Sequence, residues 1–174
     1  MPLTPYHVGP GVLIKALLRG SFSLMVFVWA QILIDLQPLV VLTTGRGQLH
    51  GFSHTYLGAT LIGVGAALSG KYAVQWIVRF TGGAQRVSWA VAFLSALIGT
   101  YSHVALDSLV YSDVSPFQPF AAVNPFLGVA SLRSARLACV LCGLAGLVLY
   151  LAVELAGPRH NKRIIGVTLT QRDP

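Results

Sequence analysis

Two short stretches of this sequence pair ionisable side chains four residues apart, inside or beside apolar segments. In SHVALD, His103 and Asp107 would share one face of a helix, where both could bind a metal or Asp107 could orient His103. In HGFSHTYLGA, His50 and His54 have the same spacing. Gly51 predicts a loop at His50 and a helix beginning near His54, although the two rings could still converge.

Imidazole and carboxylate groups together are typical ligands of zinc, manganese or iron. One catalytic zinc usually takes three protein ligands, so a larger set favours two ions, an arrangement that typically hydrolyses phosphate esters. We therefore predict a divalent metal site of one or two ions, with zinc favoured over manganese and iron. We expect Asp35, His54 and Asp107 to be the catalytic residues. The full predicted ligand set is His7, Asp35, His50, His54, His103 and Asp107.

Each of these residues, taken alone, also has a simpler interpretation. A single histidine in a membrane helix can be a hydrogen-bonding residue between helices, and Asp35 alone could be a buried structural acid. Cys139 and Cys142 lie in an apolar run without further ligands, so packing explains them better than redox chemistry or zinc binding. A site is favoured because several ionisable groups, which are costly in a membrane, gather at one predicted face.

The composition of the chain is that of a polytopic, all-α membrane protein. Of its 174 residues, 55% are hydrophobic and only 10% are charged, whereas soluble domains carry about 25% charged residues. The mean hydropathy is +0.71. The net charge of +7 comes from basic residues between apolar runs, which indicates membrane topology and lipid headgroups rather than nucleic acid as a partner.

The hydropathy pattern predicts a bundle of about five helices in a membrane domain of residues 1–157, followed by a basic cytoplasmic tail, 158–174. Pro38 should end or kink the second helix, and Ser53 should cap the third. The polar segment 71–86 is expected at the membrane interface, and a loop rich in proline and aromatic residues follows the fourth helix. The predicted helices are residues 9–19, 22–42, 54–69, 87–110 and 135–156.

Helices that alternate in direction put nine basic residues at one membrane face and three at the other. The positive-inside rule assigns the nine to the cytoplasm, so the six candidate ligands would lie at the outward face. Arg46, Arg133 and Arg136 share that face and could bind a substrate phosphate, or they could be solvated loop residues. The nine are Lys15, Arg19, Lys71, Arg79, Arg86, Arg159, Lys162, Arg163 and Arg172.

Four stretches, in order TPYHVGPG, LIDLQP, HGFSHTYLGA and GTYSHVALDSLVYSDVSPFQP, resemble the motifs of the bacterial inner-membrane metal-dependent hydrolase family. The family is distantly similar to zinc-dependent phospholipase C, and the resemblance covers roughly residues 3 to 120. It implies a multi-pass protein of the inner membrane in which His7, Asp35, His54, His103 and Asp107 are ligands or near-ligands. A phospholipid or a lipid-linked phosphate is the substrate that best suits a metal site at a membrane surface.

The sequence departs from this family's pattern in two places. The second acid of a P-D-x-D-H type segment is Gln37 here, and the histidine after it is Pro38. The family's H-R-G becomes Leu49-His50-Gly51, so His50 stands where the arginine would be, and a shift of one residue would let it serve as the first histidine. These departures favour a single metal or a non-catalytic relative over a full two-metal site.

Four functions from different classes are therefore compared. The leading one is a membrane-embedded, metal-dependent hydrolase of a phosphoester. The second is an accessory subunit with a remnant metal site, in an oligomer or a larger membrane complex. The third is a haem-binding electron carrier, with haem between His54 and His103 on different helices. A metal or proton transporter would need acids deeper in several helices than the sequence places them.

Overall fold

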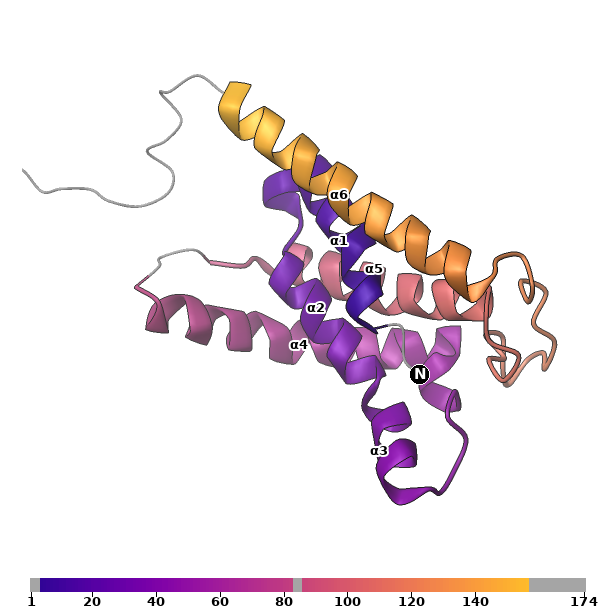
Figure 1. Ribbon diagram of the computed structural model, residues 1–174. Coiled ribbons are helices and arrows are strands. Elements are labelled where there is room, and N and C mark those ends of the chain that lie inside the picture. The colour runs from indigo at the N-terminus through magenta and orange to yellow at the C-terminus, as the bar shows by residue number, and fades with distance from the viewer. Residues whose placement is uncertain (1–3, 83–85, 157–174) are drawn as a thin grey trace, which may run out of the picture.

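The computed structural model of the protein describes residues 4–82 and 86–156, and among these residues every regular element is a helix, as predicted (Figure 1). Four segments are long and apolar enough to cross a membrane: Leu24–Thr44, Tyr56–Phe80, Trp89–Ser108 and Leu132–Ala156. The helices are α1 (Thr4–Leu18), α2 (Leu24–Ile34), α3 (Leu36–Thr44), α4 (Tyr56–Phe80), α5 (Trp89–Ser108) and α6 (Leu132–Ala156), with short 3₁₀ turns η1 (Arg19–Ser21) and η2 (Phe52–His54).

The helices pack as two groups. The antiparallel pair α4 and α5 packs against α2, and α6 packs mainly along α1, which also touches α2 (Figure 1). Small side chains fill the first group: Ala66 and Ala67 of α4 meet Ala92 and Ala96 of α5. Small residues let helix backbones approach closely, which is how helices gain packing energy in lipid.

Glycines bring α1 and α6 into backbone contact. A Cβ atom added at Gly9 would lie 2.0 Å from the carbonyl oxygen of Cys139, and one added at Gly146 would lie 2.5 Å from the backbone nitrogen of Leu13. Apart from this seam, most of α6 is exposed, and most of its outward side chains are apolar. The position of α1 therefore depends mainly on α6.

The second predicted helix is kinked, and the kink lies one turn before the proline. Pro38 has no N–H to donate to the carbonyl of Ile34, and its ring would clash with that carbonyl in a continuous helix. Accordingly α2 ends at Ile34 and α3 begins at Leu36, with Asp35 at the junction. The kink thus places Asp35 at the end of α2, outside the regular part of both helices.

The third predicted helix differs from the structure at both ends. Thr55, not Ser53, caps α4, because the Thr55 side chain accepts a hydrogen bond from the Gly58 N–H. The helix also continues to Phe80, so residues 71–80 of the segment predicted to be interfacial belong to α4. Gly70 lies within the helix and makes room for Trp29, whose Cδ1 would lie 2.9 Å from a Cβ added at this position.

The remaining predicted elements agree with the structure within a few residues, except that α1 begins five residues earlier, at Thr4, and so includes His7. The loop between α5 and α6 is irregular, as expected. The basic tail 158–174 and its predicted cytoplasmic location lie outside the described residues. Lys15 and Arg19 at the end of α1, Lys71 and Arg79 in the C-terminal half of α4, and Arg86 before α5 lie away from the helix ends that carry the candidate ligands.

Candidate metal centre

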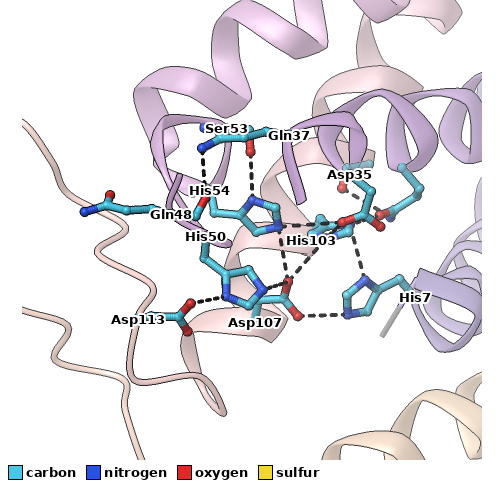
Figure 2. A network of polar contacts seen from close by, with 12 residues as sticks. His7, Asp35, Gln37, Gln48, His50, Ser53, His54, His103, Asp107 and Asp113 are labelled. Atoms are coloured by element: carbon cyan, nitrogen blue, oxygen red, sulfur yellow. Dashed lines mark hydrogen bonds and ion pairs between the residues drawn. The ribbon is translucent and has the colours of Figure 1, made fainter. Parts of the chain in front are cut away.

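The six candidate ligands converge from four parts of the fold (Figure 2). His7 comes from the second turn of α1, Asp35 from the kink between α2 and α3, and His103 and Asp107 from the last turns of α5. His50 and His54 come from the segment before α4, where His54 ends η2 rather than starting the helix itself. His50 therefore does join the cluster. Its predicted position in a loop had left open whether its ring would converge with that of His54.

Asp107 lies at the centre of the cluster. Its Oδ2 atom is 3.3 Å from His103 Nε2, 3.4 Å from His54 Nε2 and 3.9 Å from His50 Nε2. Its Oδ1 atom is 3.5 Å from His7 Nε2. One buried carboxylate thus faces all four imidazoles, which is an expensive place for a charge unless cations or protons balance it.

Asp35 provides a second carboxylate on the other side of two of these rings. Its Oδ1 atom lies 3.4 Å from His103 Nε2 and 3.8 Å from His54 Nε2. Three overlapping groups result, each with one ligand atom per residue and all such atoms within 4.8 Å of one another. They are His7 with His103 and Asp107, Asp35 with His54 and His103, and His50 with His54 and Asp107.

Several polar atoms at the centre of this cluster lack a hydrogen bond among the described residues. They include Nε2 of His7, His54 and His103 and Oδ1 of Asp107, all in side chains no more than 1% exposed. Buried polar atoms are nearly always satisfied by protein, water or an ion. Converging imidazole nitrogens and carboxylate oxygens are donors for a divalent cation, which would satisfy all of them.

Gln31 determines which nitrogen of His103 faces the acids. Its amide Nε2 donates to the carbonyl of Gly99, at 3.3 Å, so its Oε1 points at His103 Nδ1. Because an amide oxygen only accepts, His103 Nδ1 carries a proton. In a neutral ring, His103 Nε2 then presents a lone pair to two carboxylates, an arrangement that requires a cation between them. The alternative is a protonated His103 ring that is itself the cation.

Burial keeps His7 and His54 in the form that binds metals. Burial, helped by the neighbouring His103 ring, lowers the pKa of His7 to about 4. Burial also lowers the pKa of His54. Both rings are therefore neutral at pH 7, as a metal ligand must be. The Nδ1 atom of His54 lies 2.9 Å from the Ser53 hydroxyl, which orients the ring and leaves Nε2 facing the cluster.

Gln37, which stands where the resembled family has a second acid, turns away from the cluster and supports it from outside. Its Oε1 accepts a hydrogen bond from the Ser53 N–H at 2.8 Å, and its Nε2 donates to the Gln48 carbonyl at 3.3 Å (Figure 2). An added Cβ at Gly51 would lie 2.0 Å from Gln37 Nε2, so the segment packs closely on this side chain. Gln37 thus fixes the segment that carries His50 and His54.

Replacing Gln37 by alanine is expected to weaken zinc binding about 10-fold, because both loop histidines lose their support. Zinc affinity of the purified protein, measured by competition with a chromophoric chelator, checks this. Gln48→Ala is the matched control, since only its backbone carbonyl takes part. Equal affinities for the two variants would show that the Gln37 side chain does not hold the ligands in place.

Among the residues that contact the cluster, Gln31 and Asp113 were not predicted from the sequence. Gln31 is a polar residue in an apolar helix, four residues before Asp35, and that spacing was a signal that could have revealed it. Asp113 lies 2.8 Å from His50 Nδ1, in the irregular loop after α5, where no periodicity indicates a partner. Gln31 contacts the Nδ1 atom of His103, and Asp113 contacts the Nδ1 atom of His50.

The three arginines predicted to bind phosphate have different surroundings. Arg46 is exposed in the turn after α3, and Arg133 is exposed in the first turn of α6. Arg136 is partly buried, with its guanidinium 5.4 Å from the ring centre of Tyr6, the neighbour of His7. Its charge also acts on Tyr111, whose ring stacks on His50. Of these three arginines, only Arg136 has described contacts with residues next to the cluster.

What the cluster can do chemically follows from its own residues: four buried imidazoles, the buried carboxylate of Asp107 and the partly buried carboxylate of Asp35, gathered at one end of the helical bundle. Imidazole and carboxylate are the donors of catalytic zinc sites and of two-metal hydrolytic sites. No protein-family model matches this chain, and no curated protein or solved structure shows a significant match to it.

Proposed function

We propose that this chain is a membrane-embedded, metal-dependent hydrolase that cleaves a phosphoester in a phospholipid or a lipid-linked substrate. The observation that carries the proposal is the convergence of four buried histidines on Asp107, three of them with Nε2 atoms that lack a hydrogen bond among the described residues. Asp35 adds a second carboxylate to the same place. A structural role needs no such number of ionisable groups in one membrane region.

The ligand groups accommodate one ion or two. The groups His7–His103–Asp107 and His50–His54–Asp107 have only Asp107 in common, and its two oxygens face different histidines. A bound zinc ion, or manganese or iron in its place, would supply charge stabilisation and a nucleophile from water at neutral pH. Asp107 would hold the ions together, while Asp35 and His54 would complete the catalytic set.

The position of the cluster favours a lipid substrate. It lies where α5 ends and α4 begins, so it sits at one end of two membrane-spanning helices, within reach of a headgroup. The distribution of basic residues supports an outward-facing position for this end, and the motif resemblance supports a bacterial inner membrane. A phosphate at that depth would meet Arg136, whose guanidinium lies over the ring of Tyr6, the neighbour of His7 in the chain.

The test is hydrolysis of phosphoesters by purified, zinc-loaded protein in mixed micelles. Release of diacylglycerol or phosphate from phospholipids and lipid-linked phosphates is expected, and His54→Ala should abolish it. Glu154→Gln, which removes an exposed carboxylate from the far end of α6, should retain full activity. Zinc-loaded protein that cleaves none of these lipids, alone or with manganese or iron, would contradict the proposal.

Replacing Arg136 by alanine is expected to raise KM for a lipid phosphoester about 10-fold or more with little change in kcat, because a charge-assisted contact to phosphate is lost. Arg133→Ala, three residues earlier and exposed, is the matched control and should leave KM unchanged. The metal content of both variants should equal that of the wild type. An equal KM for the two variants would remove Arg136 from the substrate site.

A second candidate is an accessory subunit with a remnant site, and one observation favours it. Gln37 supports the loop instead of supplying the second acid of the motif, and Pro38 replaces its histidine. For such a subunit, His54→Ala would fold and leave cellular function intact.

A haem carrier is disfavoured, because the rings of His54 and His103 are only 5.1 Å apart between centroids and a porphyrin would have to separate them. A Soret band in the purified protein would reverse that judgement.

A further inference from the structure

His50 has a partner on each side of its ring. Its Nδ1 atom is 2.8 Å from Asp113 Oδ2, and its Nε2 atom is 3.9 Å from Asp107 Oδ2 (Figure 2). The His50 side chain is 3% exposed, whereas that of Asp113 is 51% exposed. The ring therefore links a carboxylate at the surface to a carboxylate at the centre of the cluster.

The contact with Asp113 determines the tautomer of His50. An ionised carboxylate only accepts hydrogen bonds, so His50 Nδ1–H donates to Asp113 and the neutral ring has its lone pair on Nε2. That lone pair faces the group formed with His54 and Asp107. Metal-ligating histidines typically donate their other N–H to such a carboxylate, which fixes the ring and raises its basicity.

Two ring contacts hold His50 in this orientation. Tyr111 stacks on it, with ring centres 4.7 Å apart and planes at 29°, and His54 meets it edge-on at 4.8 Å. The Asp113 hydrogen bond supplies the remaining constraint, since it selects which edge of the ring faces inward. Neither His50 nor Asp113 is a ligand implied by the resembled motifs.

We propose that Asp113 is a positioning residue that fixes the tautomer and orientation of His50, and so makes His50 a metal ligand. This rests on the metal site of the proposed function and adds to it a partner from outside the cluster. A chain that lacks the first histidine of the H-R-G segment thereby gains a ligand from the next position, stabilised by the loop after α5. An isolated, half-exposed ion pair would contribute little by comparison.

The experiment is a double-mutant cycle read by zinc affinity, using zinc alone and the full chain purified in detergent. Asp113→Ala is expected to weaken zinc binding about 10- to 100-fold. His50→Ala should weaken it at least as much, and Asp113→Ala combined with His50→Ala should be no weaker than His50→Ala alone, because Asp113 acts through His50. Glu154→Gln, which also removes one exposed carboxylate, should bind zinc as the wild type does.

Spectroscopy separates positioning from general stabilisation. Cobalt-loaded Asp113→Ala and His50→Ala should show the same change in visible absorption, while Asp113→Asn, which keeps an acceptor oxygen without the charge, should fall between them and the wild type. Unfolding temperatures of the Asn variant near that of the wild type show that the fold is intact.

Independent, additive effects of the two substitutions, or unchanged affinity in Asp113→Ala, would overturn the proposal, as would a wild-type chain that binds no zinc. Because no substrate is used, the result is separable from the hydrolase proposal. A zinc-binding chain without hydrolase activity can still show the coupling between His50 and Asp113, and an active enzyme can lack it.

Discussion

Asp107→Asn is expected to purify with almost no bound metal, whereas the wild-type chain should carry about one or two zinc, manganese or iron ions. Asp107 faces all four histidines and belongs to two of the three ligand groups. Its amide replacement keeps the shape of the side chain and removes the charge that holds a cation there. The loss should exceed the roughly 10- to 100-fold that removal of an outer partner costs. Elemental analysis of the two proteins measures it.

Glu154→Gln controls for the loss of one negative charge and should keep its metal. Unfolding in detergent shows whether Asp107→Asn remains folded. Without the central carboxylate, three imidazoles lose their nearest acid, and a folded variant that is empty of metal isolates the ligand role. No metal in the wild-type protein would instead identify the cluster as a hydrogen-bonded network in which a protonated His103 balances the carboxylates, and the proposed hydrolysis would lose its basis.

Gly9→Ala is expected to destabilise the protein by about 1–3 kcal/mol, the usual cost of overpacking. The added methyl group would lie 2.0 Å from the carbonyl oxygen of Cys139, which is backbone and cannot rotate away. The helices α1 and α6 must therefore separate. Because His7 is only two residues from Gly9 on α1, the metal content should fall as well.

Gly65→Ala is the matched control, since this helical glycine of α4 has nothing within 4 Å of an added Cβ. Alanine favours a helix over glycine by up to about 1 kcal/mol, so the control should be neutral or slightly more stable. Denaturant titration in detergent, followed by circular dichroism, compares the two variants. Equal stability and equal metal content would show that the close contact between α1 and α6 tolerates a methyl group.

The elements of this fold were largely predictable because apolar length and proline carry local information. Pro38 predicts a kink in the second helix, and the break one turn earlier, at Asp35, follows from the carbonyl that the proline ring excludes. The predictions that were wrong, a helix end and a helix cap, concern features that depend on tertiary contacts. The third helix is predicted to end at residue 69, but it continues past Gly70, which accommodates Trp29. The choice of Thr55 over Ser53 as cap depends on the contact between Ser53 and His54.

The candidate ligands were predictable as a set, because alternating helices bring them to one face. The residues that hold these ligands in place were harder to predict from the sequence. Gln31 could have been found from its spacing to Asp35. The contact of Asp113 with His50, and that of Gln37 with the segment that carries His50 and His54, depend on how irregular segments fold against each other. Loop conformation has no periodicity, so neither the Asp113 contact nor the place of His50 could be derived from residue order.

The seam between α1 and α6 has a consequence for the order of biosynthesis. All six candidate ligands are translated before residue 108, yet α1, which carries His7, takes most of its packing from α6, the last helix among the described residues. A chain interrupted before Leu132 would hold every ligand in its sequence and still lack a firmly docked His7. Assembly of the full candidate ligand set thus depends on α6, so chains truncated before this helix are not expected to hold all six side chains in place.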